Sequence, residues 1–160
     1  MSSPNDPSRR AALKAIAALA ACPLLSACEF VDHDDLDDFE VSDSASFSLS
    51  DEAFGELADI GGKACLDLGS QELLLVRTSD DEIVAFNRFC PHDNLDMGNC
   101  EGNQFPAQWD PDDEVIVCQW HQSSFATDGE NISGPADQAI EVFPVEFDPD
   151  SGEGIVFRPA

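Results

Sequence analysis

The chain has 160 residues, enough for one modest domain and a tail but not for a two-domain enzyme, since single cores usually take about 100–200 residues. Its charge is strongly unbalanced: seven Lys and Arg against 33 Asp and Glu give a net charge of −26. This charge repels phosphate groups, so nucleic acid and anionic membrane surfaces are excluded as electrostatic partners. Six cysteines are too few for a disulfide scaffold at this length, and each needs its own explanation.

Residues 1–27 have the pattern of an export signal. Arg9 and Arg10 precede an apolar run, residues 15–27, that is shorter than the roughly 20 residues needed to cross a bilayer. The paired arginines resemble a twin-arginine signal, and Leu25-Ser26-Ala27-Cys28 resembles a bacterial lipobox, whose cysteine is lipidated. We therefore expect a signal peptide over residues 1–27, a lipid anchor on Cys28, and a protein located in the periplasm or on the outer face of the membrane. The competing interpretation is an amphipathic helix with chance cysteines.

Residues 28–44 form an acidic tether, in which eight of the sixteen residues from Glu29 to Ser44 are Asp or Glu. Such a composition buries too little apolar surface to fold. The acidity of the whole chain has two explanations that the sequence leaves open. It steers a basic partner protein, or it adapts the protein to a salty environment, since the charge is spread along the chain and only two lysines occur.

Residues 45–160 are predicted to fold as one mainly β domain. Short apolar or alternating runs rich in Val, Ile and Phe are separated by turn residues, which favours strands. The expected strands are Ser46–Leu49, Ala64–Leu68, Glu72–Thr78, Glu82–Arg88, Glu114–Cys118, Ala139–Phe147 and Gly154–Arg158. Residues 79–81 are expected to turn a hairpin. One helix is expected over Asp51–Ala58, capped by Ser50 or Asp51, and long loops are expected near residues 90–108 and 121–137.

Two short motifs carry the chemistry. Cys90-Pro91-His92 and Cys118-Gln119-Trp120-His121 each offer one thiolate and one imidazole at the end of an expected strand. Zinc fingers group cysteines with cysteines and histidines with histidines, so the mixed order argues against that class. Splitting the ligands in this way suits two adjacent metals, with thiolates on one and imidazoles on the other.

The four residues Cys90, His92, Cys118 and His121 match the C-x-H and C-x-x-H pattern of the Rieske [2Fe–2S] family, which the domain resembles. The surroundings agree, since residues 95–98, 123–125 and 128–129 resemble the stretches that follow the two loops. Gly134-Pro135-Ala136 resembles the proline-containing loop that covers the cluster. The resemblance spans roughly residues 45–158 and implies stacked antiparallel sheets with a cluster-binding loop subdomain. It also implies that Ser123 donates a hydrogen bond to a bridging sulfide, and that Phe125 replaces a tyrosine that would donate a second one.

The chain departs from the family in its disulfides. Positions that carry a loop-to-loop disulfide in high-potential members are Leu95 and Trp120 here, an apolar pair that would shield the cluster instead. Cys65 and Cys100 are then unassigned. They either pair in an oxidising compartment, or Cys65 is a free thiol buried in a core strand, and the sequence does not decide between these.

The resemblance implies one-electron transfer with no substrate site, by a carrier or by the small subunit of a quinol-oxidising or arsenite-oxidase-like complex. The partner would be a cytochrome, a quinol-oxidising complex or an oxidase large subunit. A second reading is the ferredoxin component of a Rieske non-haem iron oxygenase system, because no histidine beyond His33 remains for an oxygenase iron. A third is a zinc-binding module without redox chemistry.

Overall fold

The computed structural model describes residues 43–100 and 103–159, all of which belong to one compact unit. The expected signal peptide, the expected lipid anchor at Cys28 and all but the last two residues of the acidic tether lie outside the described residues. Within the described part of the chain, no helix has the length and apolarity needed to cross a membrane. The fold is mainly β, with antiparallel sheets, as the sequence predicted.

The central sheet has the strand order β11-β4-β3-β2. Its strands are β2 (Lys63–Leu68), β3 (Gln71–Arg77), β4 (Ile83–Asn87) and β11 (Val142–Phe143). Strand β3 is buried from Leu73 to Arg77, because both faces of the sheet are covered. Leu74 and Val76 belong to one core and Leu73 and Leu75 to the other, as the two-residue period of a strand requires.

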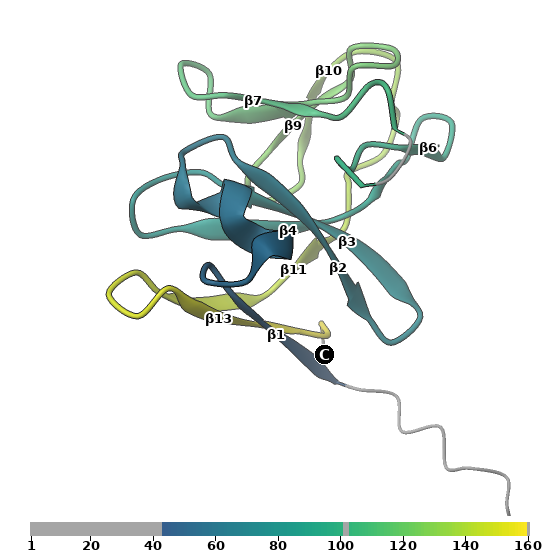
Figure 1. Ribbon diagram of the computed structural model, residues 1–160. Helices are drawn as coiled ribbons and strands as arrows, with labels where there is room; N and C mark the ends of the chain where they lie inside the picture. Colours follow the sequence, from purple (N-terminus) through teal and green to yellow (C-terminus); the bar gives the residue numbers. More distant parts are fainter. Residues whose placement is uncertain (1–42, 101–102, 160) are drawn as a thin grey trace, which may run out of the picture. The chain divides into compact units, whose positions relative to one another are not determined.

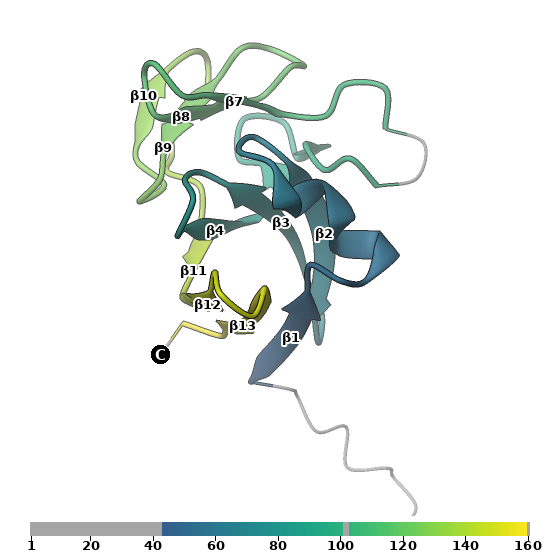
Figure 2. The ribbon, with the colours of Figure 1, turned by 60° about the vertical axis from the view of Figure 1, so that its left-hand side comes forward.

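One face of the central sheet packs on a second sheet of order β1-β13-β12 (Figures 1 and 2). Its strands are β1 (Ser44–Ser48), β12 (Val145–Asp148) and β13 (Glu153–Phe157), and the short helix η2 (Glu52–Ala58) follows β1. Phe47, Leu57, Phe143 and Val156 fill this core. Strand β1, the first strand of the domain, pairs with β13 in a register that runs from Ser44↔Phe157 to Ser48↔Glu153.

The other face is covered by the part of the fold that carries the Cys–His motifs (Figure 1). It contains a sheet of order β10-β9-β8-β7 and the small hairpin β5-β6. The strands are β5 (Phe89–Cys90), β6 (Leu95–Asp96), β7 (Gln108–Asp110), β8 (Val115–Val117), β9 (Ser124–Ala126) and β10 (Asn131–Ser133). Cys90 and Cys118 are members of the core that this layer shares with the central sheet.

Two local predictions, a side-chain cap for the helix and a single strand over Ala139–Phe147, need correction. Helix η2 is a 3₁₀ helix, and neither Ser50 nor Asp51 caps it through a side-chain hydrogen bond. In a 3₁₀ helix, side chains three residues apart align, so Phe54 and Leu57 face the core while Ala58 is exposed. The expected strand Ala139–Phe147 is two strands, because Pro144 interrupts the ladder and the chain passes from the central sheet to the neighbouring one.

The two expected long loops are also partly regular. Residues 90–108 include β6, and residues 121–137 include β9 and β10, all of them two or three residues long. Strands this short contain too few positions to show an alternating pattern. The hairpin at residues 79–81 is confirmed, since it joins β3 to β4 with the register Arg77↔Ile83.

Candidate metal centre

The first Cys–His loop is a tight turn between β5 and β6. The Asn94 amide donates a 2.8 Å hydrogen bond to the Cys90 carbonyl, and Asn94 has a left-handed φ of 52°. Asparagine tolerates this conformation better than most residues. The turn leaves Cys90 at 2% exposure in the core and places His92 at the exposed tip.

The second loop, after β8, is closed in the same way. The Gln122 amide donates a 2.9 Å hydrogen bond to the Cys118 carbonyl, and Gln122 has a φ of 64°. The Cys118 amide in turn donates to the Ser123 carbonyl at 2.8 Å. Cys118 is 1% exposed and His121 is exposed. Both loops therefore bury the thiol at the strand end and present the imidazole outward.

The predicted ligands lie as two pairs, with the two histidines facing each other and the two cysteines neighbouring each other. The Nδ1 atoms of His92 and His121 face each other at 3.2 Å, with ring centroids 4.8 Å apart and planes at 84°. Cys90 and Cys118 are both free of disulfides and buried. Burial raises the pKa of the Cys90 thiol to about 11; the His92 amide opposes this rise, and the neighbouring Cys118 adds to it. The site thus pairs two buried thiols with two exposed imidazoles.

Ser123 connects this site to the proline-containing loop. It is fully buried, and its Oγ accepts a 3.1 Å hydrogen bond from the Ala136 amide. Its hydroxyl also lowers the pKa of Cys90, which places it beside that thiol. Gly134 has a φ of 93°, and a Cβ there would lie 2.5 Å from both the Gln122 carbonyl oxygen and Ser123 Cα, so only glycine fits this crossing. Pro135 is exposed on the outside of the loop.

The remaining predicted neighbours of the site take different positions. Phe125 is fully buried, in the same core as Cys90 and Cys118. Leu95 is half-buried on β6, opposite Cys90. Trp120 is 38% exposed, and its indole Nε1 donates a 2.8 Å hydrogen bond to the carbonyl of Asp96.

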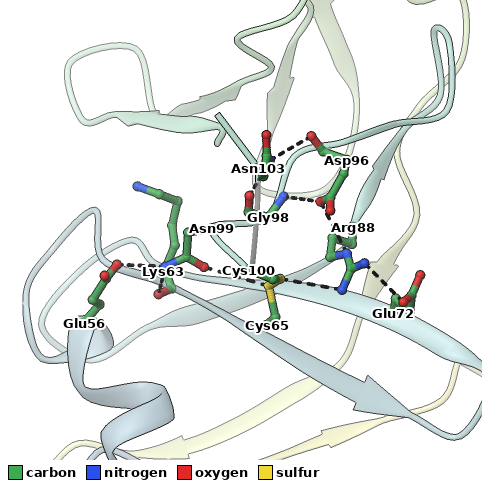
Figure 3. The surroundings of a disulfide bond; sticks show 10 residues. All are labelled: Glu56, Lys63, Cys65, Glu72, Arg88, Asp96, Gly98, Asn99, Cys100 and Asn103. Carbon is green, nitrogen blue, oxygen red and sulfur yellow. Dashed lines mark hydrogen bonds and ion pairs between the residues drawn. A yellow bond between two sulfur atoms is a disulfide. The ribbon is translucent and has the colours of Figure 1, made fainter. Parts of the chain in front are cut away.

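Cys65 and Cys100 form a disulfide, which answers the question that the sequence left open. Their Cα atoms are 6.1 Å apart, within the usual range for such bonds. The bond joins β2 to the segment that follows β6 (Figure 3). Gly98 packs so closely on it that a Cβ would lie 2.8 Å from both sulfur atoms.

Every lysine and arginine side chain in the described part of the chain is buried or half-buried and bonded internally. Lys63 donates to the Gly61 carbonyl, Arg77 to the carbonyls of Ser79 and Asp80, Arg88 pairs with Glu72 and Asp96, and Arg158 pairs with Asp43. Burial lowers the pKa of Lys63. The exposed charge on the described surface is therefore acidic.

A family model for the Rieske [2Fe–2S] domain matches residues 54–144, which include both Cys–His loops. The chain belongs to the Rieske [2Fe–2S] domain family. The ferredoxin component of the alkene monooxygenase system of Xanthobacter autotrophicus is 27% identical over 82 residues, which is 51% of this chain and 60% of that protein. This match therefore spans less than two thirds of that relative.

Two solved structures align with this chain. A putative NADH-dependent nitrite reductase small subunit from Mycobacterium tuberculosis aligns with a TM-score of 0.52 and 21% identity, covering 73% of this chain and 96% of that one. The plasma membrane Rieske protein PetC3 from Synechocystis PCC 6803 aligns with a TM-score of 0.45 and 18% identity, covering 62% and 97%.

The residues of this Rieske domain fit the cluster that the family implies. Two imidazole nitrogens on one tetrahedral metal ion, each about 2.1 Å from it, lie roughly 3.4 Å apart, and the two histidine Nδ1 atoms here are 3.2 Å apart. Among residues 43–100 and 103–159, no three His, Cys, Asp or Glu side chains gather as a single metal site. The two free thiols and the two facing imidazoles are the donor types that a [2Fe–2S] cluster with histidines on one iron takes. The cofactor of this domain is a Rieske-type [2Fe–2S] cluster.

The sequence did not reveal Asp96 as part of this region. Its backbone carbonyl receives the Trp120 indole, and its carboxylate pairs with Arg88 at 3.3 Å. Every residue has a backbone carbonyl, so the hydrogen bond from Trp120 does not require a particular residue type at position 96. The ion pair joins Arg88 and Asp96, which are eight positions apart in the sequence and meet across the β5-β6 hairpin. The two strands of this hairpin were too short to be predicted.

Proposed function

We propose that the protein is an exported, lipid-anchored one-electron carrier whose cluster is held by Cys90 and Cys118 on one iron and by His92 and His121 on the other. Electron transfer is the activity of the Rieske domain to which the chain belongs. The observation that carries the ligand assignment is the pairing of two buried free thiols with two exposed imidazoles whose Nδ1 atoms face each other.

In this proposal, the two buried cysteines protect the site from water and the two exposed histidines give a partner access to it. Cys90 and Cys118, at 2% and 1% exposure, keep water from the sulfur side of the site. His92 and His121 are exposed, so a partner protein reaches the site through their ring edges. When bound, the cluster supplies a one-electron couple. No substrate pocket is needed for this activity.

Two features support export. The twin-arginine and lipobox resemblances at residues 9–10 and 25–28 lie outside the described residues, and they match a route that carries folded proteins. The Cys65–Cys100 disulfide is an independent support, because disulfides persist mainly in oxidising compartments. The expected location is the periplasm or the outer face of the membrane.

Rieske proteins act with redox partners such as oxidase or oxygenase components. For an exported carrier, the partner is a cytochrome, a quinol-oxidising complex or an oxidase large subunit. The proposed lipid anchor keeps both proteins at one membrane.

A second candidate is the ferredoxin component of an oxygenase system, favoured by the match to the alkene monooxygenase ferredoxin. This candidate predicts a protein that stays inside the cell and passes electrons to an oxygenase. It gives no role to the lipobox-like residues or to a disulfide. The two candidates therefore differ in location.

Cell fractionation tests the location. In the native host, the full chain is expected in the membrane fraction, and Cys28→Ser in the soluble exported fraction. Cys22→Ser is the matched control, because it removes a thiol from the same apolar run but not from the lipobox-like position. Arg9→Lys with Arg10→Lys is expected to retain the precursor in the cytoplasm. A wild-type protein found in the cytoplasm would favour the ferredoxin candidate and refute export.

Metal analysis tests the ligands. The purified domain is expected to hold two irons and two acid-labile sulfides, with visible absorbance and the low average g value of a histidine-ligated cluster. Cys90→Ser and His121→Ala are expected to abolish all three. Stoichiometric zinc in a colourless wild-type protein would instead support the zinc-module hypothesis and overturn electron transfer.

A further inference from the structure

A side-chain hydrogen bond connects the second Cys–His loop to β6, the strand that follows the first Cys–His loop. Trp120, directly before His121, donates its indole N–H to the Asp96 carbonyl on β6 at 2.8 Å. The Trp120 ring lies against Phe105, with centroids 4.7 Å apart. The indole is 38% exposed, so burial of the ring alone does not account for its orientation.

The residue that receives this hydrogen bond is held firmly (Figure 3). The Asp96 carboxylate accepts from the Gly98 amide at 2.7 Å and pairs with Arg88 at 3.3 Å. Arg88 is itself paired with Glu72 on β3 at 3.1 Å. The Asp96 carbonyl also accepts from the Asn103 side-chain amide at 3.0 Å. The acceptor is therefore fixed to the central sheet.

The disulfide completes this attachment. Cys100 lies four residues after Asp96 and is bonded to Cys65 on β2. Arg88 Nη1 lies 3.6 Å from Cys100 Sγ, and Gly98 packs against both sulfur atoms. The segment from Asp96 to Cys100 is thus connected to β2 by a covalent bond and to β3 by ion pairs.

Without a disulfide between the loops, their relative position depends on such contacts. A displacement of the second loop would move His121 relative to His92, whose Nδ1 atoms are now 3.2 Å apart. Within this network, the Asp96 carbonyl is the group that accepts a hydrogen bond from that loop.

We propose that Trp120 is a positioning residue: through its indole N–H it fixes the second loop to the Asp96 carbonyl and so sets the His92–His121 geometry, and the Cys65–Cys100 disulfide holds that carbonyl in place. The proposal rests on the ligand assignment proposed above. In this proposal, the Trp120–Asp96 hydrogen bond connects the two loops, and the Cys65–Cys100 disulfide keeps its acceptor in position.

Trp120→Phe tests the proposal in the cluster-loaded protein, since phenylalanine keeps a ring against Phe105 but lacks the donor. We expect cluster loss to an iron chelator to be roughly 2- to 10-fold faster, the range that one net hydrogen bond corresponds to, with altered g values. Trp109→Phe is the matched control, because the Trp109 Nε1 is buried and has no hydrogen-bond partner. It removes the same donor and is expected to leave both readouts unchanged.

Two further variants separate the causes. Phe105→Ala removes the ring contact but keeps the hydrogen bond, and we expect a smaller effect than that of Trp120→Phe. In a Cys65→Ser, Cys100→Ser protein, Trp120→Phe is expected to add less than it does in the oxidised protein, because both changes act through the Asp96 carbonyl. Equal rates of cluster loss and equal spectra for Trp120→Phe and wild type would overturn the proposal. Strictly additive effects of Trp120→Phe and of disulfide removal on cluster loss would also overturn it.

Hydrogen exchange in the cluster-free protein gives a readout that does not depend on the metal. The Asn94 and Gln122 amides close the two loops. We expect the Gln122 amide to exchange faster in Trp120→Phe and to be unchanged in Trp109→Phe. Failure of the wild type to bind a cluster would refute the ligand assignment, whereas unchanged exchange at Gln122 would refute the role of Trp120.

Discussion

Ser123 Oγ accepts a 3.1 Å hydrogen bond from the Ala136 amide, so one buried hydroxyl joins the second Cys–His loop to the proline-containing loop. Because the amide is the donor, the hydroxyl hydrogen of Ser123 remains available to donate. Its effect on the pKa of Cys90 places it on the sulfur side of the centre. Ser123 therefore contributes both to loop structure and to the electrostatics of the site.

Replacing Ser123 by alanine is expected to lower the reduction potential. A hydroxyl that donates to a cluster sulfur stabilises the more negative, reduced state, and one net hydrogen bond of about 1 kcal/mol corresponds to roughly 40 mV for one electron. The Ala136 amide also loses its acceptor, so faster cluster loss is expected as well. Protein-film voltammetry measures the potential. A potential equal to or above that of the wild type would show that this hydroxyl does not donate toward the cluster.

The converse change is Phe125→Tyr. Phe125 is fully buried in the core that contains Cys90 and Cys118, and the family resemblance implies that a tyrosine hydroxyl there donates a second hydrogen bond to the cluster. We expect a potential a few tens of millivolts above that of the wild type, by the same conversion of about 40 mV per hydrogen bond. Phe86→Tyr, an equally buried phenylalanine of the same core, is the control for simply adding a buried hydroxyl. A lower potential in Phe125→Tyr would mean that β9 does not present residue 125 to the cluster.

The disulfide is expected to contribute substantially to stability. Cys65 and Cys100 are 35 residues apart, and closing a loop of that length restricts the unfolded chain by about 3–4 kcal/mol. The double variant Cys65→Ser, Cys100→Ser should show a lower denaturant midpoint in the oxidised state. Under reducing conditions the wild type should fall to the midpoint of the variant. A variant as stable as the oxidised wild type would contradict this expectation.

The central part of the fold was predictable from the sequence, and the reason is visible in β3. Leu73 to Val76 are buried on alternate faces, and an apolar run of this length is long enough to identify a strand. The Cys–His pairs were identified because ligand chemistry restricts residue type. By contrast, the Trp120–Asp96 contact uses a backbone carbonyl, and β6 has only two residues. The sequence pattern contains no signal for this contact or for a strand of two residues.

The pH dependence of the cluster-free protein follows from the Cys90 thiol. Its folded-state pKa is raised from 9.0 to about 11, chiefly by burial, so between these values the folded chain holds a proton that the unfolded chain has lost. This stability is fully present below pH 9 and is lost as the pH rises to about 11. Chemical denaturation of the cluster-free protein across this range should show the decline. Cys90→Ser should reduce it, and an unchanged slope in that variant would assign the decline to other groups.

The acidic surface predicts a dependence on ionic strength. Every lysine and arginine side chain in the described residues is bonded internally, so the charge that a small redox reagent meets is negative. A cationic metal complex should oxidise the reduced protein faster at low salt, with a rate that falls as salt is added, because the Debye length shrinks from about 30 Å at 0.01 M to 3 Å at 1 M. An anionic complex should show the opposite trend. Stopped-flow kinetics with both reagents measures the effect at the exposed His92 and His121 edges. If neither rate changes with salt, the acidity does not act at the electron-transfer site, and adaptation to a salty environment becomes the better explanation.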